Sequence, residues 1–253
     1  RNEIEKGWIC CLCNRWMYLH SGMPSLLVTL VEAVCCICGS KLEMKKNYIY
    51  ILIAFLALLF VSCSSKIEME LKKDGSIDLA FTGETGKGLE KLIRTSQNIM
   101  AEKPVFNTKG IQADLMADNF SNVKVTTPTN NSLAIKMTDT EKKSLFFTSG
   151  VVQVKNNKLL VNISPRILVN FYEAADPELS MYLDMLLSPV FNGEEMTDHE
   201  YLELVKGFYG DDVAQEIKKA EINLVLKNPD GTKSEHKISL VEVLTLNKSL
   251  QLE

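Results

Sequence analysis

The stretch from Ser64 to Glu253 contains no cysteine, because all seven cysteines of the chain lie at or before residue 63. This stretch therefore has no disulfide and no thiol nucleophile, and its stability must come from packing. It also lacks a basic cluster, since 22 Lys and Arg stand against 28 Asp and Glu, a net charge of −6. Nucleic acids and anionic lipid surfaces are negatively charged and attract positively charged proteins. We therefore expect no nucleic-acid partner.

The sequence also lacks the common catalytic and nucleotide-binding motifs. No phosphate-binding loop, dinucleotide glycine fingerprint or Gly-x-Ser-x-Gly elbow is present. The glycine-rich stretch 82–88 lacks the full spacing, and we interpret it as a strand-to-helix loop. His236 stands among charged residues on an expected edge strand, without a second histidine at ligand spacing. We therefore expect no metal in this part of the chain.

One compact polar cluster follows Cys63, namely Asp198-His199-Glu200 with two carboxylates nearby at 211–212. A catalytic interpretation makes His199 a base oriented by a carboxylate. However, adjacent residues on a helix point in different directions, and negative charge suits the first turn of a helix. We expect no catalytic residue and a non-enzymatic protein. A periplasmic hydrolase that uses the 198–212 region is the alternative.

An apolar run from Tyr48 to Val61 begins shortly after Met44 and two lysines. A charged start, an apolar stretch of this length and a small residue before the break are typical of a secretory signal peptide. The run is only 14 residues long, short of the roughly 17 to 25 that span a bilayer. Residues 44–62 are therefore predicted to be a signal peptide.

The segment 59–63, Leu-Phe-Val-Ser-Cys, resembles the lipobox of bacterial lipoproteins, with Phe60 where Leu is usual. The resemblance implies that Cys63 carries a covalent diacylglycerol and a fatty acid such as palmitate, and becomes the new N-terminus. Stable anchoring takes more than one acyl chain, which a diacylated cysteine supplies. Three residues separate Cys63 from the first strand, a reach of roughly 10 to 13 Å. We therefore expect the domain to lie close against the membrane.

Residues 1–43 contain six cysteines and both tryptophans, ahead of this leader. Two Cys-x-x-Cys pairs can close a tetrahedral zinc site: Cys10, Cys13, Cys35 and Cys38. The pairs are 21 residues apart, just past the usual spacing of about 15 to 20, and the segment between them is more apolar than a zinc ribbon requires. Because an export leader follows, we expect residues 1–43 to be non-native or removed. A zinc-ribbon protein and a cytoplasmic or membrane extension are the alternatives.

Alternating hydrophobicity predicts a series of hairpins in residues 63–253, which are expected to form one domain. Strands at 67–71 and 77–81 flank Asp74-Gly75, a type I′ turn signal. Further pairs flank 128–131, 156–157 and 228–231, and the last strand is expected over 237–246. The two hairpins with Asp-Gly turns, near the ends of this stretch, are candidates to pair in one sheet.

Helices are predicted between these hairpins. One begins near Gly88 and carries an apolar face of Leu89, Leu92, Ile93 and Met100, and a shorter one carries Ile111 and Leu115. Two more begin at 164–165 and 176–177, each a cap residue followed by proline. Thr197 and Glu200 form a capping box for a helix that ends at Gly210. Asp211 or Asp212 then caps a short helix. The predicted fold is α+β, an antiparallel sheet built from hairpins with helices packed on it, preceded by a signal peptide.

The stretch 167–191 places apolar side chains around most of two helices rather than along one stripe. Such helices are buried on several sides or partly exposed for a purpose. Ordinary core is one interpretation. The other is an apolar groove for an acyl chain or a partner, in which methionines adapt to the ligand. Its candidate residues are Phe171, Tyr172, Met181, Tyr182 and Met185.

Four short motifs after Cys63 support a resemblance to a group of whole proteins, in addition to the lipobox-like segment. They are Lys-Asp-Gly-Ser at 73–76, Phe-Asn-Gly-Glu-Glu-Met-Thr at 191–197, Glu-Tyr-Leu at 200–202 and Tyr-Gly at 209–210. With these motifs, the chain from Cys63 onward resembles uncharacterised lipoproteins of spirochaetes, of the treponemal type. The resemblance implies a cell-envelope lipoprotein on the periplasmic or surface side, and it supplies no catalytic residues. We expect a membrane-anchored binding or scaffolding domain for a partner protein or a hydrophobic ligand.

Overall fold

A computed structural model describes residues 65–173, 184, 186–193 and 195–253. All of them belong to one compact unit, which spans residues 46–253. The predicted leader at 44–62, the lipid site at Cys63, the cysteines of residues 1–43 and the helix expected at 176–177 lie outside the described residues. Within them the fold is α+β, as the sequence predicts.

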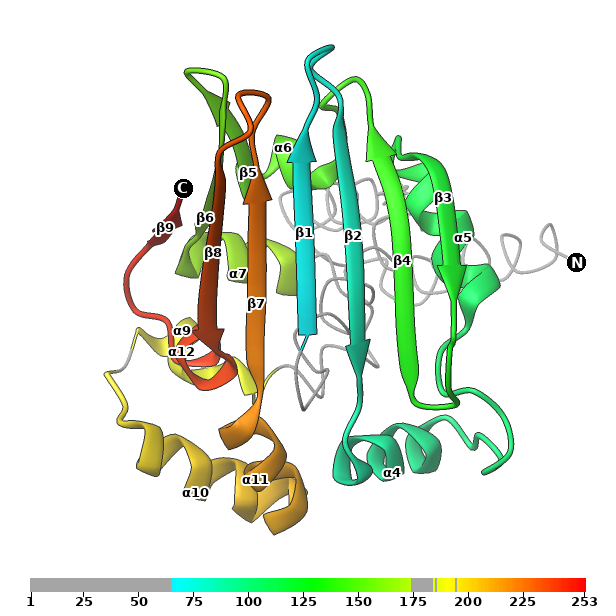
Figure 1. Ribbon diagram of the computed structural model, residues 1–253. Helices are drawn as coiled ribbons and strands as arrows, with labels where there is room; N and C mark the ends of the chain where they lie inside the picture. Colours follow the sequence, from blue (N-terminus) through cyan, green and yellow to red (C-terminus); the bar gives the residue numbers. More distant parts are fainter. Residues whose placement is uncertain (1–64, 174–183, 185, 194) are drawn as a thin grey trace, which may run out of the picture. The chain divides into compact units, whose positions relative to one another are not determined.

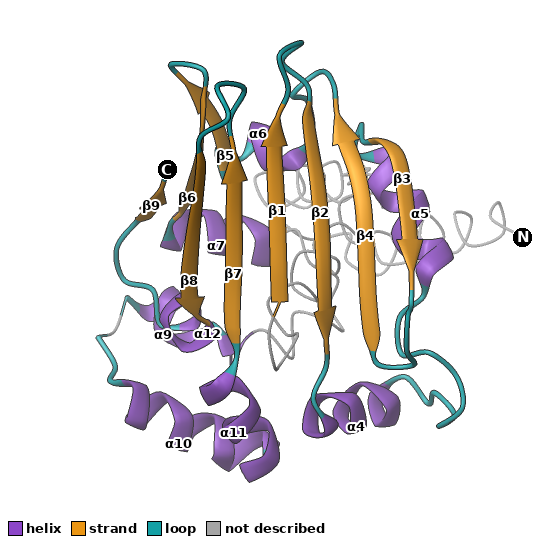
Figure 2. Ribbon diagram, in the orientation of Figure 1, coloured by secondary structure: helices purple, strands orange, loops and turns teal. Residues whose placement is uncertain are grey.

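A six-stranded sheet forms the larger layer of the described structure (Figures 1 and 2). Its strands lie in the order β3-β4-β2-β1-β7-β8. Five of the six coincide closely with predicted strands, whereas β8 begins four residues before the strand expected over 237–246 and overlaps it only at 237–239. The bounds are β1 Ser65–Leu71, β2 Ile77–Glu84, β3 Ser121–Thr126, β4 Ser132–Asp139, β7 Glu221–Lys227 and β8 Lys233–Ser239.

This sheet is mixed, which corrects the expectation of an antiparallel sheet. Strands β1 and β7 run parallel, with Ser65 opposite Ile222 and Ile67 opposite Leu224. The pair joins the first hairpin to the hairpin of β7 and β8, as Figure 1 shows by the cyan strand beside the orange one. The expectation that these two hairpins share a sheet is therefore confirmed.

A second, three-stranded antiparallel sheet has the order β5-β6-β9. Its strands are β5 Val152–Lys155, β6 Lys158–Ile163 and β9 Leu250–Leu252. The turn between β5 and β6 uses Asn156 and Asn157, both with positive φ, as a two-residue type I′ turn requires. The predicted type I′ turn at Asp74-Gly75 is wrong, because only Gly75 has positive φ there and the loop is longer.

The helices form between the strands and at one end of the larger sheet. They are α4 Lys87–Ser96, α5 Thr108–Ala117, α6 Leu145–Thr148, α7 Pro165–Glu173, α9 Ser188–Asn192, α10 Asp198–Tyr209, α11 Asp211–Lys219 and α12 Leu240–Leu244. The predicted capping box of α10 is present, with the Thr197 side chain accepting from the Glu200 N–H. Helix α11 is capped by Gly210 without a side-chain bond, so the cap expected from Asp211 or Asp212 is wrong.

Two other expectations differ from the structure. Helix α4 ends at Ser96, and Met100 lies beyond it with 60% of its surface exposed rather than on the buried face. The strand expected over 237–246 stops at Ser239 and gives way to α12. The Leu240 N–H donates to the carbonyl of Ala220, which turns the chain out of the sheet.

The two faces of the six-stranded sheet differ in character. On one face, Lys227 of β7 pairs with Glu68 of β1 at 3.1 Å, and Lys72 pairs with Asp78 at 3.3 Å. Such exposed ion pairs contribute little stability. The other face is apolar and packs against the second sheet, and Figure 1 shows α5, α6 and α7 on that side. The core of the domain therefore lies between the two sheets.

Candidate functional site

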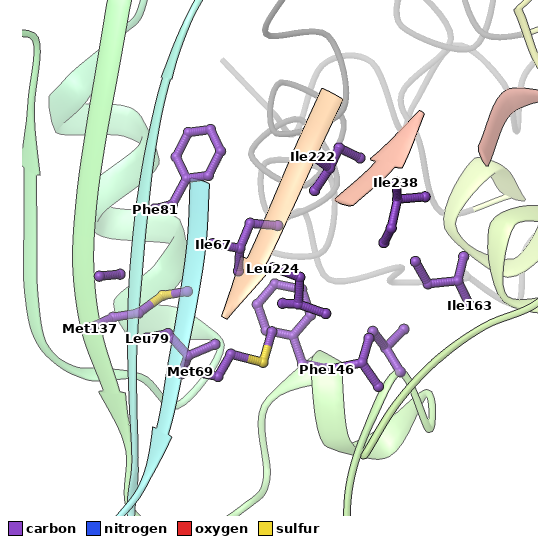
Figure 3. A pocket seen from close by; sticks show the side chains of 13 residues that line it. Ile67, Met69, Leu79, Phe81, Met137, Phe146, Ile163, Ile222, Leu224 and Ile238 are labelled. Carbon is purple, nitrogen blue, oxygen red and sulfur yellow. The ribbon is translucent and has the colours of Figure 1, made fainter. Parts of the chain in front are cut away.

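A cavity of about 60 Å³ lies between the apolar face of the six-stranded sheet and the layer that contains α6 and β6. Every residue that lines it is apolar, and Figure 3 shows their side chains converging from several elements. From the sheet come Ile67, Met69, Phe81, Met137, Leu224 and Ile238, among others. The opposite layer contributes Phe146, Val151, Val161 and Ile163.

Strand alternation places these residues on one face. Ile67 and Met69 of β1 stand opposite Phe81 and Leu79 of β2, so all four face the same side. Protein interiors are otherwise packed like organic crystals, and empty cavities with apolar walls stay dry. The cavity can hold about four to six water-sized groups, at roughly 10 to 15 Å³ each. The site can therefore accept a short apolar chain.

Ser65 does not line the cavity, but it lies two residues before the lining residue Ile67 on β1. Its side chain is only 1% exposed, and its hydroxyl has no hydrogen-bond partner. Alternation along β1 turns Ser65 to the same face as Ile67, and Ser65 pairs with the lining residue Ile222. A buried hydroxyl without a partner costs free energy. A ligand with an apolar chain and a hydrogen-bond acceptor at one end would match both the cavity and this hydroxyl.

Access to the cavity is indicated by Ile67. Eleven of the lining residues are buried, whereas Ile67 and Ala80 are half-buried. Ala80 alternates with the inward-facing Leu79 and Phe81 and so belongs to the other face of the sheet, which leaves Ile67 as the accessible residue on the cavity face. Because Ile67 is the third residue of β1, the accessible part of the wall lies near the start of that strand. Met69 and Met137 supply flexible side chains deeper in the wall.

The far wall of the cavity is held by two buried carboxylates. Helix α6 carries Phe146, and the Asp118 carboxylate accepts a hydrogen bond from the Leu145 N–H at 2.9 Å. Asp139 accepts from the N–H groups of Glu141 and Lys142 at 3.1 and 2.6 Å, which fixes the loop before α6. Burial raises the pKa of Asp118 to about 6, and the nearby Asp139 adds to the rise.

The apolar groove expected from sequence involves a different part of the chain. Met181, Tyr182 and Met185 lie outside the described residues, and Phe171 lies in α7. Tyr172 is half-buried; its ring packs on Phe191 with centroids 4.4 Å apart, and its hydroxyl donates to Asp184. Tyr172 does not line the cavity. The groove therefore stays a prediction, and the cavity is a separate feature.

Sequence reasoning missed the cavity because its walls are ordinary strand residues. The alternation that exposes Ile67 and Met69 to one face is visible in the sequence. That two sheets face each other there and leave a void depends on how β6 and α6 lie against β1 and β7. No residue type among the lining positions signals a ligand.

The predicted polar cluster does not converge. Asp198 begins α10 and Asp211 follows its end, about 17 Å away along the helix axis. Glu200 accepts from the N–H and hydroxyl of Thr197, and these bonds lower its pKa. Asp211 pairs with Lys206 at 3.0 Å. These carboxylates therefore serve the ends of helices.

Within the glycine-rich stretch 82–88, β2 ends at Glu84 and α4 begins at Lys87, so the predicted strand-to-helix loop is limited to residues 85–86. The Glu216 carboxylate of α11 accepts hydrogen bonds from the N–H groups of Gly88 and Leu89 at 2.6 and 3.0 Å. It therefore takes the place that an anionic ligand would occupy at the start of α4. The Glu216 carboxylate therefore links α11 to the start of α4.

His236 lies on the edge strand β8, where its Nε2 is 2.9 Å from the carbonyl of Glu253. Among the described residues, no group of three or more His, Cys, Asp or Glu side chains is arranged to hold a metal. In the same part of the chain, the structure contains no helix with the length and apolar character needed to cross a membrane. No protein-family model, curated protein or solved structure matches the chain.

Proposed function

We propose that this protein is a cell-envelope lipoprotein, anchored through Cys63, whose folded domain binds a single apolar chain between its two sheets. The anchor is supported by the leader and the lipobox-like segment that ends at Cys63. The binding activity is supported by the cavity. The protein acts by binding rather than by catalysis.

One observation carries the binding proposal: a cavity has entirely apolar walls, and the buried, unpartnered Ser65 stands opposite its lining residue Ile222. The walls offer no partner for a polar or charged group, so only the apolar part of a ligand enters. The Ser65 hydroxyl donates to an acceptor at the end of that chain. An acyl chain with its carbonyl has this combination.

The size of the cavity sets the affinity. Four to six buried methylenes contribute at most about 3 to 5 kcal/mol, at about 0.8 kcal/mol each. The cost of immobilising the ligand reduces this gain. Since a millimolar dissociation constant corresponds to about 4 kcal/mol, a free short chain should bind with millimolar affinity at best.

Binding is tested by titrating the chain of residues 63–253, carrying Cys63→Ser, with 1-octanol and recording isoleucine methyl NMR spectra. A dispersed spectrum establishes that this chain is folded. We expect shifts at four lining residues, Ile67, Ile163, Ile222 and Ile238. Ile111 and Ile217 are buried but do not line the cavity, and should not respond.

A variant that fills the cavity provides the matched control. Val161→Phe places a ring in the lining and should abolish the octanol response at the four isoleucines while keeping a dispersed spectrum. Shifts spread equally over lining and non-lining isoleucines would contradict the proposal, as would an unchanged spectrum at octanol saturation.

The anchor is tested separately, by growing cells that express the parent chain or Cys63→Ser with radiolabelled palmitate. The parent should incorporate label and partition into detergent, whereas Cys63→Ser should contain no label. Equal labelling of the two proteins would refute acylation at Cys63. Peptides from residues 1–43 in the mass spectrum of native protein would refute removal of that segment.

A further inference from the structure

We infer that the cavity's occupant is an acyl chain carried by Cys63 of the same molecule. This inference rests on the proposed function and identifies its ligand. It places one chain of the lipid anchor inside the domain when the chain is not in the bilayer.

The position of Cys63 is the first argument. Strand β1 begins at Ser65, so position 63 lies two residues before it and at most about 7 Å from it along the chain. Ser65 stands opposite the lining residue Ile222, and the accessible lining residue Ile67 is two residues further on. A chain attached at position 63 is therefore four residues before the accessible lining residue Ile67 along the sequence.

The alternation of side chains along β1 is the second argument. Side chains at 65, 67, 69 and 71 face the core, whereas Lys66 is exposed on the other face. A group at position 66 would lie on the opposite face.

The third argument is chemical. The Ser65 hydroxyl is buried and has no partner. A carbonyl of the acyl group on Cys63 would accept from this hydroxyl while the methylenes enter the apolar space. The cavity holds only about four to six water-sized groups, so part of the chain enters and the rest follows the surface near Ile67.

Concentration is the fourth argument. A cavity this small binds a free chain with millimolar affinity at best. Short flexible tethers give effective concentrations in the millimolar range. A tethered chain therefore competes for the cavity where dilute free lipids do not.

The consequence concerns membrane binding. Stable anchoring takes two signals, because a single acyl chain gives only marginal, reversible binding. Sheltering one chain inside the domain would weaken the hold of the anchor on the membrane. Because a bilayer buries the whole chain and the cavity only four to six of its groups, the cavity shelters the chain only while the anchor is out of the bilayer.

The experiment uses the single thiol of residues 63–253. Cys63 is modified with octyl methanethiosulfonate or with its methyl analogue, which gives two proteins that differ only in the length of one chain. We expect the octyl protein, without added ligand, to show shifts at Ile67, Ile163, Ile222 and Ile238 relative to the methyl protein. Its apparent affinity for free octanol should be about two-fold lower, because the effective concentration of the tethered chain is close to the millimolar dissociation constant.

A displaced chain is the control. Cys63→Ser combined with Lys66→Cys carries the octyl group on the opposite face, and this protein should match the methyl protein at the four isoleucines. If the octyl and methyl proteins at position 63 have the same spectra and both bind octanol, the inference is refuted and the proposed function stands. If neither octyl attachment nor octanol moves the four methyl signals, both are refuted.

Discussion

The charge of Asp118 should control stability between about pH 4 and pH 6. This residue follows α5, is only 5% exposed, and accepts one hydrogen bond, from the Leu145 N–H. Burial raises its pKa from 3.8 to about 6, with a smaller rise from the Asp139 carboxylate. The folded protein therefore holds this proton more tightly than the unfolded chain does.

The sign of the effect follows from proton linkage. Between these two pKa values the native state binds more protons, so the free energy of unfolding falls as pH rises from about 4 to about 6. At about 1.4 kcal/mol per pKa unit, the full difference is about 3 kcal/mol. Asp118→Asn removes the charge and keeps an oxygen that can accept from Leu145. The variant should therefore be more stable than the parent at pH 7.5, by up to about 3 kcal/mol, and similar to it at pH 4.

Urea unfolding followed by circular dichroism at pH 4.0, 5.0, 6.0 and 7.5 measures this difference. Asp74→Asn is a control of opposite sign, because hydrogen bonds from Ser76 lower the pKa of the exposed Asp74. Loss of the Asp74 carboxylate should lower the free energy of unfolding near neutral pH. The effect should become smaller as the pH falls through the lowered pKa of Asp74. If Asp118→Asn changes stability equally at pH 4 and pH 7.5, or lowers it at pH 7.5, the buried-charge argument is wrong.

Two further predictions concern α4 and the cavity. Glu216→Ala leaves the N–H groups of Gly88 and Leu89 without this acceptor and should cost about 1 to 2 kcal/mol in urea unfolding; an equal loss in the exposed control Glu221→Ala would contradict a specific capping role. Val161→Leu adds a methylene into the cavity and should be close to neutral, whereas Val225→Leu, at a buried strand position that does not line the cavity, should cost about 1 to 3 kcal/mol. Equal losses at both valines would mean that the cavity does not relieve overpacking.

Local signals in the sequence predicted much of the secondary structure. The alternation in β1 and β2, the asparagines at 156–157 and the capping box of α10 each depend on neighbours within a few residues. Such features have physical causes that a short window contains, and they formed where predicted. The α+β class followed from their order along the chain.

The region after Ser239 shows where local reasoning fails. Its apolar run predicts a continued strand, yet Leu240, Val241, Val243 and Leu244 are buried in the short helix α12. A short apolar run fits a buried strand or a buried helix equally well. Contact with α11 and the bond from Leu240 to Ala220 decide between them.

Residues close together in the chain were enough to predict most of the strands and the capping box of α10, because the physical causes of these features are local. The parallel pairing of β1 with β7, two strands about 150 residues apart, depends on the packing of the whole domain. The cavity also depends on tertiary packing, because a void is the difference between the space that two sheets enclose and the volume of the side chains that fill it. No single strand specifies that difference, so the cavity exists only where β1, β7, β6 and α6 pack together.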